Sequence, residues 1–135
     1  MNWTFAAAVA LGGAIGAPLR LLIDSRVTRA VSESHRLTGR VTSNARDFPW
    51  GLLVVNALGS VLIGIAYASI DGPWRALIAT GVCGALTTYS SYALFIHGVW
   101  RRNRRAAWRA IITMPVVCIT ACALAVVTSR TVIGA

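Results

Sequence analysis

Four long stretches of this sequence contain no charged residue, and this feature limits the possible folds more than any other. Residues 1–19, 48–70, 76–100 and 110–129 lack Asp, Glu, Lys and Arg, so the 13 basic and 4 acidic residues all lie between or beside them. A helix that crosses a bilayer needs about 20 mostly apolar residues. A soluble core would instead alternate apolar and polar positions along each element. The pattern therefore excludes an ordinary soluble domain and predicts four membrane crossings.

The predicted fold is one all-α transmembrane domain over residues 1–135, with spans at about 3–23, 48–70, 75–100 and 107–129. Tryptophan rings prefer the lipid–water interface, and all five tryptophans lie near span ends: Trp3, Trp50, Trp74, Trp100 and Trp108. We expect residues 24–47 to form a long polar loop with at most a short surface helix. No segment remains for a catalytic or nucleotide-binding domain, so we do not expect an enzyme.

The net charge of +9 does not by itself indicate a nucleic-acid partner. Loops beside membrane helices are commonly basic, because the insertion machinery and anionic lipid favour positive charge there. Ionisable residues at membrane depth, which mark proton-coupled pumps, are almost lacking in the predicted spans. We therefore expect a multi-pass protein of the inner (plasma) membrane that contacts lipid, not nucleic acid, and has no buried carboxylate.

The third span is expected to be a broken helix. Gly81 and Gly84 precede the hydroxyl-rich residues 87–92, and neither feature favours a helix interior. A break at membrane depth is tolerated only where protein or a cavity satisfies the freed backbone groups. Freed carbonyls can bind a small hard cation, whereas N–H groups, amides and hydroxyls can donate to an anion. We place the functional centre at residues 84–92, with a kinked packing helix as the alternative.

Asn56 is the other polar feature at membrane depth, because an amide in hydrocarbon is costly unless it is paired or hydrated. It shares a helical face with Ser60 and Gly64. A hydrogen bond that only joins two helices is one interpretation of this residue. A donor on an ion path is the other.

Three segments resemble motifs of the Fluc (CrcB) family of fluoride-specific channels. They are GGAIGAPLR at residues 12–20, VNALGS at residues 55–60 and GVCGALTTYSSY at residues 81–92. The motifs occur in the family's order and on three of the four predicted spans. The resemblance implies an antiparallel dimer of four-helix subunits with a broken third helix and two narrow pores. It also implies that the channel exports fluoride from the cytoplasm and so lowers its toxicity.

The resemblance further implies a role for individual residues. Arg20 would lie in a vestibule, and the fluoride path would be formed by Asn56, Tyr89, Ser90, Ser91 and Tyr92. A structural Na⁺ would be bound by the backbone carbonyls of Gly84 and Thr87 from each subunit. Leu52 stands where the family has threonine, and tyrosine replaces phenylalanine at positions 89 and 92. A non-conducting structural or partner subunit of a heterodimeric channel is therefore the alternative.

The arginine distribution predicts a single orientation in the membrane. Residues 24–47 and 101–109 each carry five arginines and share one side, whereas only Arg75 and Arg130 lie on the other side. By the positive-inside rule, both termini should face out. An antiparallel homodimer requires one sequence to insert both ways. We therefore expect a non-identical partner from the same family, and otherwise a homodimer.

This orientation can be tested with a cysteine introduced by Arg102→Cys in a variant that lacks the three native cysteines. A membrane-impermeant thiol reagent applied to intact cells should not label it, because the 101–105 turn is expected inside. Equal labelling from both sides of the membrane would demonstrate dual insertion and favour the homodimer.

Overall fold

The computed structural model describes residues 2–38 and 48–134, and nearly all of this part of the chain is helical. Three helices are long and apolar enough to cross a membrane: α1 (Trp3–Thr38), α3 (Trp50–Ser69) and α7 (Arg104–Ile133). Between α3 and α7 lie α4 (Gly72–Arg75), η1 (Ala76–Cys83), α5 (Gly84–Leu86) and α6 (Tyr89–Trp100). These four pieces together form the third of four crossings in chain order, and this crossing is interrupted, so the expected all-α multi-pass fold is confirmed.

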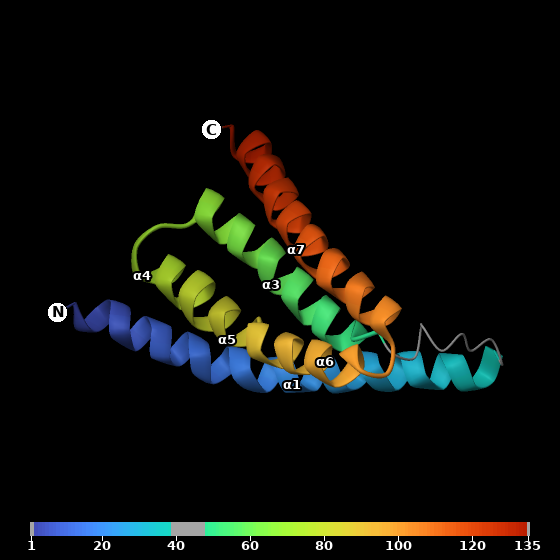
Figure 1. Cartoon of the computed structure of the whole chain (residues 1–135). Coiled ribbons are helices and arrows are strands. Elements are labelled where there is room, and N and C mark those ends of the chain that lie inside the picture. The colour runs from blue at the N-terminus through green and yellow to red at the C-terminus, as the bar shows by residue number, and fades with distance from the viewer. Residues whose placement is uncertain (1, 39–47, 135) are drawn as a thin grey trace.

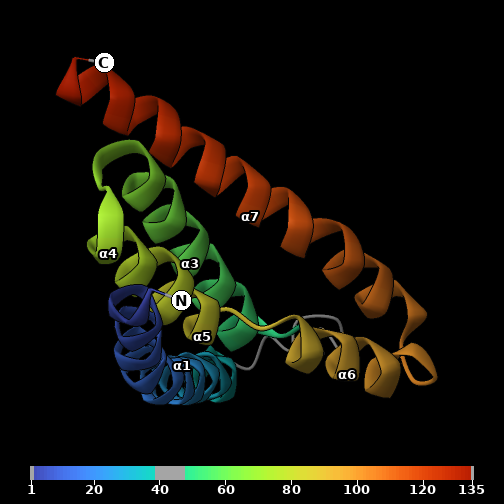
Figure 2. The same cartoon turned by 90° about the vertical axis from the view of Figure 1, so that its left-hand side faces the viewer.

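Helix α1 runs below the pieces of the broken crossing, and α3 and α7 lie above them (Figure 1). Helices α3 and α7 lie side by side over most of the length of α3, and the second view agrees (Figure 2). Helix α1 packs against η1 and α5, and α6 packs against α7. The N-terminus and α4 lie at one end of the molecule, and the turn between α6 and α7 lies towards the other. The broken crossing is therefore held between α1 on one side and α3 and α7 on the other.

The first helix is longer than the sequence predicted. Helix α1 has 36 residues and continues to Thr38 without interruption, so the expectation of a polar loop is wrong for residues 24–38. Hydroxyl side chains fit this extension because they bond backward to their own helix. Ser32 Oγ donates to the Thr28 carbonyl at 2.8 Å, and Ser25 Oγ donates to the Leu22 carbonyl at 3.1 Å. Residues 39–47, the rest of the expected loop, lie outside the described residues.

The predicted break in the third crossing is confirmed, and it lies at Thr87 and Thr88, within the predicted residues 84–92. Thr87 (φ −77°, ψ 152°) and Thr88 (φ −149°, ψ 119°) are extended, whereas Gly84 (φ −62°, ψ −34°) is helical. Branching at Cβ makes threonine well suited to extended backbone. The helix resumes at Tyr89 with Thr88 as its N-cap, because Thr88 Oγ1 accepts from the Ser91 N–H at 3.2 Å.

The glycines instead allow close contact between backbones. A Cβ at Gly12 would lie 2.8 Å from the Gly81 Cα, and a Cβ at Gly16 would meet the Val82 carbonyl. Small residues at such crossings let membrane helices approach closely where larger side chains would separate them. Gly12 and Gly16 thus form the close-approach surface of α1, while a Cβ at Gly13 would meet nothing within 4 Å.

Adjacent glycines therefore give a matched test of this crossing. Gly12→Ala should destabilise the folded protein by about 1–3 kcal/mol, because the added methyl group overlaps the backbone of η1. Gly13→Ala adds the same methyl group in open space and should leave stability nearly unchanged. Thermal unfolding of the purified proteins in detergent measures both. Equal destabilisation by the two variants would show that the crossing is not the cause.

Candidate functional site

The side chain of Asn56 pairs with the backbone at the break. Asn56 Oδ1 accepts from the Thr88 N–H at 2.7 Å, and Asn56 Nδ2 donates to the Thr88 carbonyl at 3.4 Å. Both residues are buried, with exposed fractions of 8% for Asn56 and 7% for Thr88. A second contact joins Asn56 Nδ2 to the thioether of Met114 at 3.9 Å. The amide therefore provides hydrogen-bond partners for the N–H and the carbonyl of Thr88, which is extended and cannot obtain them from a helix.

The motif around Asn56 explains why the two segments fit together. Gly59 lies three residues further along α3, so it shares the helical face of Asn56. A Cβ at Gly59 would overlap the methyl group of Thr87. The Thr87 hydroxyl turns back and donates to the Cys83 carbonyl at 2.9 Å. Gly59 thus makes room for Thr87, while Asn56 binds Thr88.

The pairing also removes the usual donors of two backbone carbonyls. In an unbroken helix the Gly84 carbonyl would accept from the Thr88 N–H, and the Thr87 carbonyl from the Ser91 N–H. Here the first N–H donates to Asn56 Oδ1 and the second to Thr88 Oγ1. Gly84 is exposed, and a Cβ there would meet nothing within 4 Å. Two carbonyls of the expected cation site are therefore released from the helical ladder.

Hydroxyl groups gather at the start of α6. Thr88 Oγ1 donates to Ser91 Oγ at 3.1 Å and lies 3.4 Å from Ser90 Oγ. The predicted path residues Asn56, Ser90 and Ser91 are thus joined through Thr88. Thr88 was not among the predicted site residues, although its place between Thr87 and Tyr89 in the hydroxyl-rich run was a usable signal.

The two tyrosines are neighbours that differ in exposure. Tyr92 is buried in a cluster with Ala110 and Met114, and its hydroxyl donates to the Ala110 carbonyl at 3.4 Å. Tyr89 has 80% of its surface exposed. The ring centroids are 5.9 Å apart and tilted by 55°. Tyr92 therefore packs against α7, while the ring of Tyr89 is exposed on the surface of the subunit.

The position of Arg20 relative to the other predicted site residues is inferred from its neighbours on α1. Gly16 lies against Val82 and Ala85, and Arg20 is one turn further along the same face of α1. Among the described contacts, no hydrogen bond joins Arg20 to Asn56 or to the first turn of α6. The structure thus brings Asn56 and residues 84–92 together and leaves Arg20 half-exposed on the neighbouring helix.

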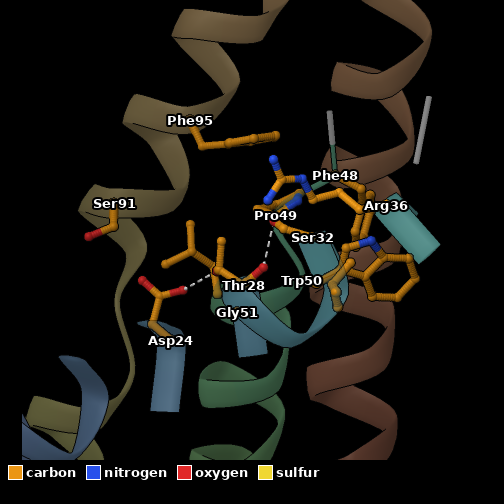
Figure 3. A pocket seen from close by; sticks show the side chains of 12 residues that line it. Asp24, Thr28, Ser32, Arg36, Phe48, Pro49, Trp50, Gly51, Ser91 and Phe95 are labelled. Atoms are coloured by element: carbon orange, nitrogen blue, oxygen red, sulfur yellow. Dashed lines mark hydrogen bonds between the residues drawn. The ribbon is translucent and has the colours of Figure 1, made fainter. Parts of the chain in front are cut away.

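A cavity of about 620 Å³ opens between α1, the start of α3 and α6 (Figure 3). One wall is apolar and comes from residues 48–52 and Phe95, while Ser91 lies at its edge. The extension of α1 supplies the rest of the lining, which is Val31 and a row of polar residues: Asp24, Thr28, Ser32 and Arg36. This cavity was not predicted, because residues 24–38 were expected to belong to a loop. The spacing of four residues within the polar row was the available signal.

The fold and the site define a small multi-pass membrane protein in which a broken helix presents hydrogen-bonding groups at membrane depth. Neutral donors and freed carbonyls suit the passage or binding of an ion better than bond-making chemistry. The chain belongs to the CrcB family, because residues 7–129 match the family described as "CrcB-like protein, Camphor Resistance (CrcB)".

Individual relatives carry the name fluoride-specific ion channel FluC. The protein of Rhodospirillum rubrum is 38% identical over 95 residues, which cover 64% of this chain and 63% of the relative. That of Aeromonas salmonicida is 41% identical over 99 residues, covering 69% of this chain and 66% of the relative. That of Erythrobacter litoralis is 36% identical over 106 residues, covering 73% and 71%. The chain thus matches slightly less than two thirds of the first two relatives.

The pairing of Asn56 with Thr88 predicts a specific loss of stability. Asn56→Leu keeps a similar volume but leaves the Thr88 N–H and carbonyl without partners, which should cost about 1–3 kcal/mol. The Thr88 amide should also exchange its hydrogen faster. Ser60→Ala, one turn away on the same helix, serves as the control and should change neither thermal unfolding nor that exchange rate. Unchanged exchange at Thr88 in Asn56→Leu would contradict the assigned role of Asn56.

Proposed function

We propose that this chain is a subunit of a passive fluoride-selective channel in the cell's inner (plasma) membrane. It would let fluoride leave the cytoplasm and so reduce fluoride toxicity. The observation that carries the proposal is the junction of Asn56, Thr88 and the first turn of α6, where an amide and several hydroxyls meet at a helix break. Membership of the CrcB family and the printed names of the relatives support the same function.

The chemistry of fluoride fits these groups. Fluoride is a small, strongly hydrated anion that only accepts hydrogen bonds, so a pore must replace its water with donors. Asn56 Nδ2 has two hydrogens, and its contact with the Met114 sulfur at 3.9 Å is weak. One N–H can therefore turn to the ion while the other keeps Thr88 in place. Ser90 and Ser91 would supply hydroxyl donors next to it.

The tyrosines would contribute the positive edges of their rings. The Tyr92 hydroxyl is engaged by the Ala110 carbonyl, which supports a ring-edge role because the polar tip points away from α6. The exposed ring of Tyr89 would line the path once a second subunit covers it. Arg20 would raise the local concentration of anions in a vestibule.

A structural Na⁺ would fit the carbonyls of Gly84 and Thr87. Both are neutral hard oxygens whose usual helical donors are engaged elsewhere. Two carbonyls alone do not complete a cation's coordination shell, so a second subunit would supply the same pair. The bound ion would neutralise the partial charges of the freed carbonyls and hold two subunits together.

A dimer is supported by the exposure of the predicted site. Gly84, Tyr89 and Ser90 are each exposed in the single subunit, and Leu94 on α6 is 73% exposed. We propose an antiparallel dimer with a non-identical family member, since the arginine bias favours one orientation for this chain. A homodimer is the other arrangement.

A non-conducting partner subunit is the second candidate function. The observation that favours it is Leu52, which replaces the family's threonine and packs against the cluster of Tyr92, Ala110 and Met114. A hydroxyl that could serve the ion path is therefore replaced by an apolar side chain.

Fluoride efflux from liposomes, followed with a fluoride electrode, tests the proposal. Tyr89→Phe should conduct like the wild type because the ring is kept, whereas Tyr89→Ala should lose most of the flux. The exposure of Tyr89 makes both variants compatible with the subunit fold. A dead Phe variant beside a conducting Ala variant would refute the ring-edge role.

Two further conditions separate the alternatives. Efflux only when a second family member from the same genome is co-reconstituted would identify a partner subunit, and no efflux with or without one would overturn the channel proposal. Strict removal of Na⁺ from both sides should abolish efflux. Undiminished efflux without Na⁺ would refute the structural Na⁺ site.

A further inference from the structure

The lining of the cavity between α1, the start of α3 and α6 has an apolar part and a polar part. Phe95 and residues 48–52 supply most of the apolar part, and α1 supplies the polar row, which contacts Gly51 at Asp24 and Thr28. At about 620 Å³ the cavity is far larger than one water molecule, whose share of liquid volume is about 30 Å³. Its polar row gives water several partners, so the cavity can hold water.

A chain of polar groups leads from this cavity to the buried amide. Ser91 lines the cavity and accepts from Thr88 Oγ1 at 3.1 Å. The backbone of Thr88 in turn binds Asn56. One hydroxyl-bearing residue, Ser91, therefore separates the cavity from the Asn56–Thr88 pair.

Two charged residues line the cavity within the described part of the chain. They are Asp24 and Arg36, at opposite ends of the polar row. Arg36 lies across the cavity from Asp24 and Ser91 (Figure 3). Twelve residues of helix place Asp24 and Arg36 about 18 Å apart along α1, which is beyond the screening length of about 8 Å at physiological salt. Asp24 lies against the first turn of α3, because a Cβ at Gly51 would meet its carboxylate. The positive end of the α3 dipole therefore offsets part of the Asp24 charge.

We infer that this cavity is a hydrated entry chamber through which the anion reaches Ser91, and that Arg36 attracts the anion into it while Asp24 opposes it. The inference rests on the proposed anion channel and adds a charge-controlled mouth built by the extension of α1. Arg36 acts at a distance by raising the local anion concentration. It does not contact the ion at the Asn56–Thr88 pair.

Efflux at different ionic strengths tests the inference. Arg36→Gln should lower fluoride efflux about three- to tenfold at about 0.01 M salt, and the difference should disappear near 1 M because screening removes the attraction. Asp24→Asn should raise efflux under the same low-salt conditions. Arg26→Gln removes the same charge from an exposed position on the same helix outside the cavity, and it should match the wild type.

Covalent modification provides a second measurement on one folded protein. Arg36→Cys should lose efflux, regain it with a cationic thiosulfonate reagent and not regain it with an anionic one. Arg26→Cys and the wild type, treated identically, serve as controls. If the wild type conducts fluoride and the Arg36 variants conduct equally well, the entry chamber is refuted but the channel proposal is not. Equal losses of efflux in the Arg26 and Arg36 variants would have the same consequence. Absence of wild-type efflux, with and without a partner, would overturn the channel and this inference together.

Discussion

The two hydrogen bonds between Asn56 and the backbone of Thr88 are the interaction on which the rest of the site depends. A peptide group without a helical partner is costly at membrane depth, so the break could not persist without them. By taking the Thr88 N–H, Asn56 also releases the Gly84 carbonyl. The side chain of Thr88 then binds the Ser91 N–H and releases the Thr87 carbonyl. One amide thereby produces both a set of donors and a set of free acceptors.

This interaction requires the helices to lie unusually close. Gly12 and Gly16 of α1 contact the backbone of η1, and Gly59 of α3 contacts the side chain of Thr87. A methyl group at any of these positions would push the broken crossing away from Asn56 or from α1. The small residues therefore serve the site indirectly, since they fix the distance over which Asn56 can reach Thr88.

The distribution of charge follows the same division between membrane depth and surface. The groups at the break are neutral, and the charged groups of the cavity lie on the extension of α1. A neutral path can release a small anion that a buried guanidinium would hold too tightly. A guanidinium such as Arg36, placed at the mouth, can raise anion concentration without binding the ion along the path.

The sequence by itself determined the number of crossings, the break in the third one and the identity of its polar residues. These properties depend on local composition, because lipid excludes charge from each span and hydroxyl-rich segments make poor helices. Only the tertiary structure decided what satisfies the backbone at this break, since Asn56, which binds Thr88, is 32 residues away in the chain. The length of α1 was also hidden from the sequence. Residues 24–38 are polar enough to read as a loop, yet they continue a helix whose polar row faces a cavity bounded by α3 and α6.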